Sequence, residues 1–190
     1  MPDKRPLLPL AIAIVATSAI TACAQTTPAA KAESPQLCLT GETVGFSCAL
    51  RDGRLLSLCA SAGFLDFKGN PTDNPSPAYV AVGAGPAQTR YRFPADPSRY
   101  QQHMYFWVSA SGQPHLFVAA SPTPFLHFSL DIEAPVHVMS EATPADWPLA
   151  PSGNNALCAS QADRSQLDAF MSQMPDEADW RTRFSGQPGR

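Results

Sequence analysis

The residues of this sequence best suited to chemistry are its four histidines, because imidazole changes charge near neutral pH and binds metal ions. They are His103, His115, His127 and His137, which lie 12, 12 and 10 residues apart. Each falls in its own predicted strand near a turn, so the four could meet at one edge of a sheet and bind zinc or copper. Metal-binding histidines normally have a second ligand close by in sequence, and none of these has one. The four are therefore candidates for a metal site in a chain that we otherwise expect to hold no metal or cofactor.

Patterns typical of hydrolases are weak in the same region. Ser111 and Gly112 lie in the string SASGQ, which lacks the first glycine of the nucleophile elbow, and no S-x-x-K motif occurs. Asp131 and Glu133 would share one face of a strand, but paired carboxylates are more simply a solvated edge. We therefore expect a protein without catalytic residues.

The aromatic run Tyr105-Phe106-Trp107 cannot lie wholly in a core, because successive side chains of a strand point to opposite faces. Phe106 should point inward, while Tyr105 and Trp107 point outward. A helix or loop covering that outer face would explain the pair most simply. Otherwise the two rings form a contact surface for a partner, so Tyr105 and Trp107 are the candidate binding residues.

The segment at residues 109–112 (Ser-Ala-Ser-Gly) suggests an alternative function. It is similar to the Ser-x-Gly loop of a family of periplasmic lysozyme inhibitors, which are small disulfide-bonded β-proteins. The tyrosine and tryptophan that follow this loop in the family are here replaced by Gln113-Pro114-His115. An acidic protein would be steered toward a basic enzyme such as lysozyme. Inhibition of lysozyme-like hydrolases is thus the alternative to a structural or binding role.

The start of the chain predicts export. Lys4 and Arg5 precede an apolar stretch of 14 residues at 7–20. That stretch is shorter than the roughly 20 residues of a membrane-spanning helix, but it suits a secretory signal peptide over residues 1–22. The next residue, Cys23, follows Ile-Thr-Ala and so resembles the lipid-modified cysteine of a bacterial lipobox. We favour a lipoprotein anchored there to the outer membrane, whereas ordinary cleavage after Ala24 would release a soluble periplasmic or secreted chain.

The rest of the chain divides into three predicted parts. Residues 23–35 are small, polar and proline-containing, which is typical of a flexible tether. Residues 36–175 are the right length for a single β-rich domain, and the charged residues 176–190 predict a disordered tail. The net charge of −3 and the lack of a basic stripe argue against a nucleic-acid partner. The expected partners are the membrane, through the lipid anchor, and a protein of the cell envelope.

Composition and periodicity predict an all-β fold. The 20 prolines disfavour long helices, because a proline inside a helix costs about 3 kcal/mol. Period-two runs between turns predict strands at 43–50, 55–61, 79–82, 88–93, 103–110, 115–119, 125–132, 136–140 and 156–159. We expect a small antiparallel barrel or sandwich of about eight strands. Leu167, Phe170, Met171 and Met174 recur at helical spacing after Asp163, which predicts one short C-terminal helix.

Four cysteines, Cys38, Cys48, Cys59 and Cys158, predict two disulfides in an exported chain. The Asp-Gly dipeptide at 52–53 predicts a two-residue hairpin turn. That turn would place Cys48 and Cys59 diagonally on one face, with Cα atoms about 7 Å or more apart, beyond the preferred disulfide distance. Two pairings remain. Cys38–Cys48 with Cys59–Cys158 is the preferred one, and Cys38–Cys59 with Cys48–Cys158 is the other.

The order of these motifs resembles a family of uncharacterised exported proteins and lipoproteins of Proteobacteria. The similarity lies in the string C-x-x-G-E-x-x-x-F-S-C at 38–48, the string SLCAS at 57–61, the strand of Tyr79 with its glycine-rich turn, and a last cysteine, Cys158, before a helix. After the tyrosine the family has Tyr-Arg-Phe-Gly, where this chain has Val-Ala-Val-Gly. The resemblance implies export, disulfides and a β-fold. It implies no activity.

Overall fold

The structure is a computed structural model that describes residues 35–85, 88, 91–120, 123–130, 136–140, 143–152, 157–159 and 163–184. The predicted signal peptide, the predicted lipidation site Cys23 and all but the last residue of the predicted tether lie outside the described residues, as do Asp131 and Glu133. The chain divides into a unit of Met1–Ala32 and a unit of Glu33–Arg190, and the fold of the second follows. In the residues described, no helix has the length and apolar character needed to cross a membrane.

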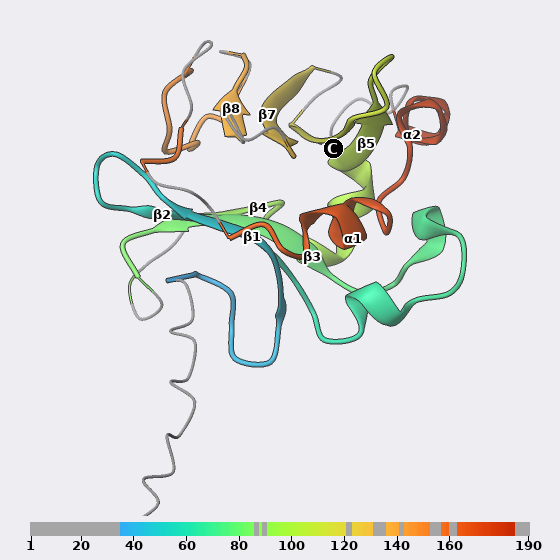
Figure 1. The fold of residues 1–190 in the computed structure, drawn as a ribbon, viewed down its shortest axis with the longest axis horizontal. Helices are drawn as coiled ribbons and strands as arrows, with labels where there is room; N and C mark the ends of the chain where they lie inside the picture. Colours follow the sequence, from blue (N-terminus) through green and yellow to red (C-terminus); the bar gives the residue numbers. More distant parts are fainter. Residues whose placement is uncertain are drawn as a thin grey trace, which may run out of the picture. The chain divides into compact units, whose positions relative to one another are not determined.

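The first sheet is a four-stranded antiparallel meander in the order β1-β2-β3-β4 (Figure 1). Its strands are β1 (Thr43–Ala49), β2 (Leu55–Ala60), β3 (Ala78–Gly83) and β4 (Tyr91–Phe93). Every residue of β2 and β3 is buried. This explains their sequences, LLSLCA and AYVAVG, because strands covered on both faces do not show a clean alternation of apolar and polar residues.

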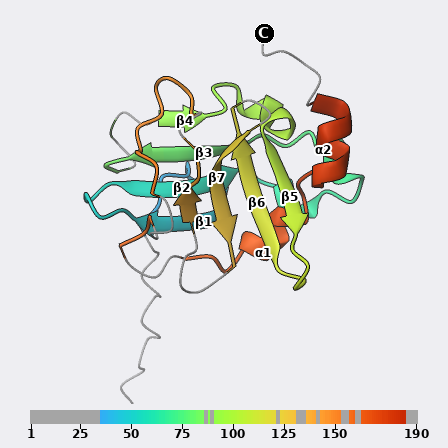
Figure 2. The same cartoon turned by 90° about the horizontal axis from the view of Figure 1, so that it is seen from above.

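The second sheet has the order β5-β6-β7-β8 and is also antiparallel. Its strands are β5 (Met104–Val108), β6 (Pro114–Ala119), β7 (Pro124–Ser129) and β8 (Val136–Val138). The strands of this sheet run across those of the first (Figure 2). The prediction of an all-β, antiparallel, two-disulfide fold is confirmed. The predicted late strand at 156–159 is reduced, in its described part, to an isolated bridge between Cys158 and Leu50.

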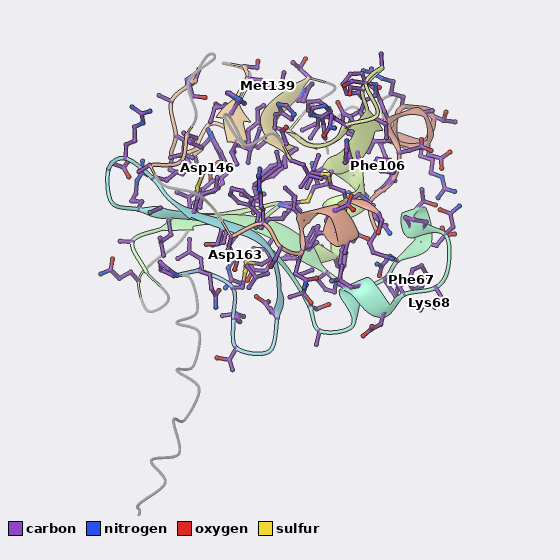
Figure 3. All side chains as sticks on the ribbon, viewed as in Figure 1. Phe67, Lys68, Phe106, Met139, Asp146 and Asp163 are labelled. Atoms are coloured by element: carbon purple, nitrogen blue, oxygen red, sulfur yellow. A yellow bond between two sulfur atoms is a disulfide. The ribbon has the colours of Figure 1, made fainter. Side chains whose placement is uncertain are left out.

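Side chains from both sheets fill the space between them (Figure 3). Phe46 of β1 meets Phe128 of β7 edge-to-face, with ring centroids 5.2 Å apart. Each large apolar side chain buried in this way contributes about 1.5 to 3 kcal/mol. The fully buried members of this core include Phe46, Leu56, Leu58, Val80, Met104, Leu116, Val118, Phe125, Leu126, Phe128, Leu167 and Phe170.

The first hairpin differs from the prediction at its turn. Gly53 has φ +85°, but no described residue other than glycine has a positive φ. Asp52 therefore cannot complete the two-residue turn, which needs a positive φ at both central residues. Instead the amide of Leu50 donates to the carbonyl of Arg54 at 2.8 Å, and three residues form the loop. Cys48 consequently lies opposite Leu56 rather than Ser57.

The preferred disulfide pairing was wrong and the other pairing is present. Cys38 is bonded to Cys59 and Cys48 to Cys158, with Cα separations of 5.4 and 5.7 Å. The register explains the difference. Cys48 lies in the core between the sheets, whereas Cys59 belongs to a cluster on the outer face of the first sheet. Each cysteine can therefore bond only to the segment that covers its own face.

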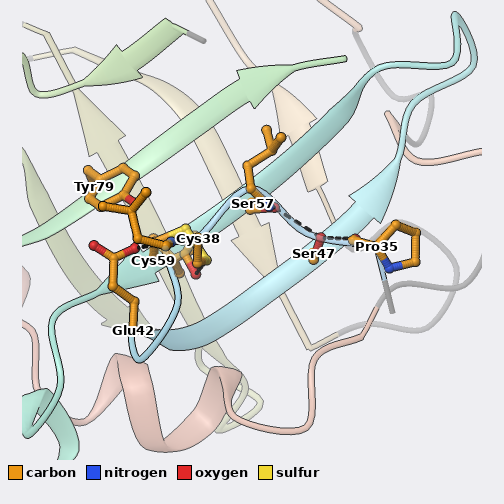
Figure 4. Close-up of a disulfide and its surroundings, with 10 residues drawn as sticks. Pro35, Cys38, Glu42, Ser47, Ser57, Cys59 and Tyr79 are labelled. Atoms are coloured by element: carbon orange, nitrogen blue, oxygen red, sulfur yellow. Dashed lines mark hydrogen bonds between the residues drawn. A yellow bond between two sulfur atoms is a disulfide. The ribbon is translucent and has the colours of Figure 1, made fainter. Parts of the chain in front are cut away.

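The outer face of the first sheet is covered by residues 35–42, the segment that carries Cys38 (Figure 4). Leu37 is fully buried there, and its amide donates to the Ser57 hydroxyl at 3.0 Å. The Ser47 hydroxyl donates to the Pro35 carbonyl at 2.8 Å. The carboxylate of Glu42 accepts from the Tyr79 hydroxyl at 2.5 Å. Hydrogen bonds and a disulfide thus fasten a short extended segment across this face.

Two short helices follow the strands. The predicted helix is α1 (Leu167–Met171), although Asp163 accepts from the Ser165 amide before it instead of capping it. The prediction of a disordered tail was wrong over α2 (Glu177–Phe184). Trp180 anchors this second helix, because its ring packs against Tyr105 at a tilt of 31° with centroids 4.6 Å apart and the residue is 2% exposed.

Candidate binding face

The second sheet turns one face toward the core and the other away from the first sheet. Because alternate residues of a strand share a face, the outer face carries two rows of side chains that follow the strand pairing. One row runs Tyr105, Phe117, His127, His137 and the other runs Trp107, His115, Ser129. We call this set of residues the outer face of the second sheet.

Three of the four histidines are brought together on this face. Nδ1 of His115 lies 2.9 Å from Nε2 of His127, so one ring donates a hydrogen bond and the other accepts it. His137 lies directly opposite His127 in the strand pairing, and their rings stack with centroids 6.0 Å apart. The three imidazoles therefore form one continuous cluster across β6, β7 and β8.

Aromatic rings hold two of these imidazoles in place. Trp107 stacks on His115 at 5.4 Å between centroids, and Phe117 stacks on His127 at 4.8 Å with an interplanar angle of 18°. Stacked rings restrict rotation about the side-chain bonds and exclude water from the ring faces. The cluster is thus half-buried although it lies on the outside of a sheet.

The charge state of His127 follows from this environment. Burial is the main cause that lowers its pKa to about 4, and the charges that His115 and His137 would carry contribute to the same decrease. Burial disfavours the charged form of an imidazole, as does a neighbouring imidazolium. His127 is therefore neutral at neutral pH.

His103 lies apart from the cluster. Its Nδ1 is 3.1 Å from the carbonyl oxygen of Ala119, to which it donates, and its ring packs edge-on against Phe93. Burial lowers the pKa of this imidazole too. Its contacts are those of a structural side chain that joins the start of β5 to the end of β6, so it is not part of the candidate site.

The two candidate aromatic residues have different surroundings. Tyr105 is 2% exposed beneath α2, as the prediction of a covering helix requires, whereas Trp107 remains 40% exposed. Helix α2 contacts the end of the face around Tyr105, Phe117 and Ala119. The part around Trp107 and the three histidines is left partly open.

The turn at residues 109–112 is built like the first hairpin turn. Gly112 has φ +80°, and the amide of Ser109 donates to the carbonyl of Gln113 at 2.9 Å. The hydroxyls of Ser109 and Ser111 lie 2.8 Å apart, and Ser109 Oγ also accepts from the Gln113 amide. The serine hydroxyls thus hold the turn together, which gives no support to a nucleophilic role. The similarity to a lysozyme-inhibitor loop stays a prediction.

One other group of possible metal ligands occurs within the described ranges, formed by Cys38, Glu42 and Cys59. Both sulfur atoms belong to a disulfide, so neither offers the thiolate that a metal ion requires. The three clustered histidines do not form a closed set of ligands either, because their ligand nitrogens do not all lie within 4.8 Å of one another.

The strand pairing of the histidines could have been anticipated in part from the sequence. His127 and His137 are equally distant from position 132, so a turn centred there places them opposite each other. The distance of His103 from the cluster depends on where β5 begins, and the sequence gave no such signal for that. No family model, curated protein or solved structure matches this chain.

Proposed function

We propose that this chain is an exported protein of the cell envelope that has no catalytic activity and binds a partner through the outer face of its second sheet. The two disulfides support export, because such bonds persist in oxidising compartments. The lipobox-like sequence at Cys23 supports an anchor in the outer membrane, with a soluble periplasmic or secreted form as the alternative.

The observation that carries the proposal is the difference between the two sheets. A disulfide-bonded segment closes the outer face of the first sheet. Helix α2 covers only one end of the outer face of the second. On the part of this face that α2 leaves open, Trp107 is 40% exposed. Large rigid rings bury much area at a low cost in conformational entropy, which is why tryptophan is common in the centre of binding surfaces.

Photo-crosslinking in cells of the source organism tests this proposal. A photoreactive amino acid placed at Trp107 should give a discrete adduct, because that ring would lie within the contact. The matched control is the same amino acid at Arg51, an exposed residue at the tip of the first hairpin, which should give none. Equal adducts from both positions, or no adduct from position 107, would contradict the binding face.

Inhibition of lysozyme is the second candidate, and it is favoured by the place of the exposed turn at 109–112 directly after Trp107 and Val108. Lysis of cell walls by hen-type and goose-type lysozymes should slow when the protein is added. No change at micromolar excess of protein removes this candidate and leaves the binding face to be tested by crosslinking.

A further inference from the structure

We propose that His115, His127 and His137 bind a divalent transition-metal ion, zinc or copper, on the outer face of the second sheet. This inference rests on the proposed function, since it names a ligand of the same face. The three side chains come from three adjacent strands and meet in the fold without being close in sequence.

Two of the ligand atoms are already nearly in place. Nδ1 of His115 and Nε2 of His127 are 2.9 Å apart. Nitrogens bound to one tetrahedral zinc ion at about 2.0 to 2.1 Å lie about 3.3 Å from each other. For both nitrogens to bind one ion, the ring that donates this hydrogen bond must carry its proton on its other nitrogen instead. The two nitrogens must also separate by a few tenths of an ångström while both rings tilt, so that their lone pairs converge on the ion.

The third ligand is His137, directly opposite His127 on β8. Its ring is stacked on that of His127 with centroids 6.0 Å apart, so rotation about its side-chain bonds moves a ring nitrogen toward the pair. The strand that carries it has three residues and lies at the end of the sheet. This rotation, together with the small separation of the His115 and His127 rings, would complete the metal site.

The surroundings of the pair favour a metal ion. Trp107 stacks on His115 and Phe117 on His127, so both rings are held from the side. Rings that are already held in place lose little rotational freedom when the ion binds.

Ligand type selects the ion. Imidazole nitrogens suit zinc and copper, whereas magnesium and calcium prefer oxygen ligands. A site with three protein ligands leaves a coordination position for water or a further group. A side chain of a binding partner is a group of this kind, which would make the metal part of the contact made by the outer face.

Calorimetric titration of the full chain, expressed from residue 1 without a polyhistidine tag and stripped with EDTA, tests the site. Zinc sulfate and copper sulfate should each bind with one equivalent, while magnesium chloride should not bind. His115→Gln, His127→Gln and His137→Gln should each weaken binding by about 100-fold. The matched control is His103→Gln, which should leave affinity within about twofold because that imidazole lies outside the cluster.

A second measurement does not depend on histidine variants that fold. The chain has three tryptophans, and among the described ring contacts Trp107 is the one that stacks on a ring of the cluster. Copper bound there should quench part of the tryptophan fluorescence of the wild type, and Trp107→Phe should abolish that quenching. The same quenching in Trp107→Phe would place the copper elsewhere and overturn the proposal.

The outcomes separate the two proposals. A chain that binds neither metal, or that loses as much affinity with His103→Gln as with His127→Gln, overturns the metal site whatever crosslinking shows. A chain that binds metal through the three histidines but gives no adduct from position 107 supports the metal site and contradicts the contact with a protein partner.

Discussion

Cys48 of β1 is bonded to Cys158, 110 residues further along the chain. The neighbouring Leu50 pairs with Cys158 in an isolated bridge, and the amide of Ala159 donates to the carbonyl of Ala49 at 2.7 Å. β1 is the edge strand of the first sheet, so the bond holds a late segment against an otherwise unpaired edge. A covered edge cannot pair with a strand of another molecule.

Loss of this disulfide should cost more than loss of the other. Cys48–Cys158 closes a loop of 110 residues and Cys38–Cys59 one of 21. The chain-entropy relation gives about 4.8 and about 3.3 kcal/mol, so the double variant C48A/C158A should be less stable than C38A/C59A by about 1.5 kcal/mol. Urea unfolding without reductant measures both. The opposite order would mean that the contacts of Leu37 and its segment outweigh loop entropy.

Gly45 of β1 should not tolerate a side chain. A Cβ atom there would lie 2.8 Å from Cγ of Phe170 and would overlap Cδ2 of the same ring. Phe170 is fully buried, so the ring cannot move into solvent, and Gly45→Ala should lower the free energy of unfolding by about 1 to 3 kcal/mol.

A double-mutant cycle with Phe170→Leu checks the cause of that loss. The smaller side chain removes the overlap, so the second substitution of each pair should cost less than the same substitution alone. Gly45 lies where the pairing of β1 with β2 shifts register, between Val44 and Phe46. Additive losses would show that Gly45 matters for the backbone at this irregularity rather than for the packing of α1.

The sequence predicted the strands well and the strand register poorly, and the first hairpin shows why. Short runs of mainly apolar residues identify β1 and β2 whatever the turn, because both runs are bounded by polar residues. The register depends on whether Asp52 adopts a positive φ, which composition does not determine. A shift of one residue in the pairing moves every side chain of one strand to the other face relative to its partner strand. This shift puts Cys48 and Cys59 on opposite faces of the sheet and so decides the disulfide pairing.

At the candidate binding face, the sequence likewise predicted which way the side chains point but not what covers them. Period-two alternation predicted that Tyr105 and Trp107 would point outward, and they do. What lies over them depended on α2, whose charged sequence resembles a tail and whose stability comes from Trp180 packing against Tyr105. Helix stability of this kind comes from tertiary contacts rather than from local propensity, so sequence periodicity gave no sign of it.

Stability should fall in mild acid because of His127. In the unfolded chain its pKa is near 6.5, and in the folded chain about 4. As pH decreases from 7 to 4, the unfolded state therefore takes up a proton that the folded state does not. The free energy of unfolding should fall by as much as about 3 kcal/mol over this range and stay constant above it.

Urea unfolding at several pH values measures this dependence. His115 and His137 are the titratable groups whose charge acts on His127, so a full profile should be recorded for His127→Gln alongside the wild type. The variant should lose most of the slope between pH 6.5 and 4 and keep the smaller contribution of His103, whose pKa burial also lowers. An unchanged slope would exclude His127 as its source.

Trp180 should be replaceable by phenylalanine but not by alanine. Its ring packs against Tyr105, yet its indole nitrogen is buried without a hydrogen-bond acceptor among the described residues. Trp180→Phe keeps an aromatic contact and removes the unsatisfied donor, so we expect a change of less than about 1 kcal/mol in unfolding free energy. Trp180→Ala should cost about 3 kcal/mol or more and should speed amide exchange over Glu177–Phe184, because α2 would lose its anchor. An equal loss of unfolding free energy in the phenylalanine and alanine variants would contradict this account. It would mean that the indole nitrogen is hydrogen-bonded in solution and that the aromatic contact with Tyr105 alone does not hold α2 on the sheet.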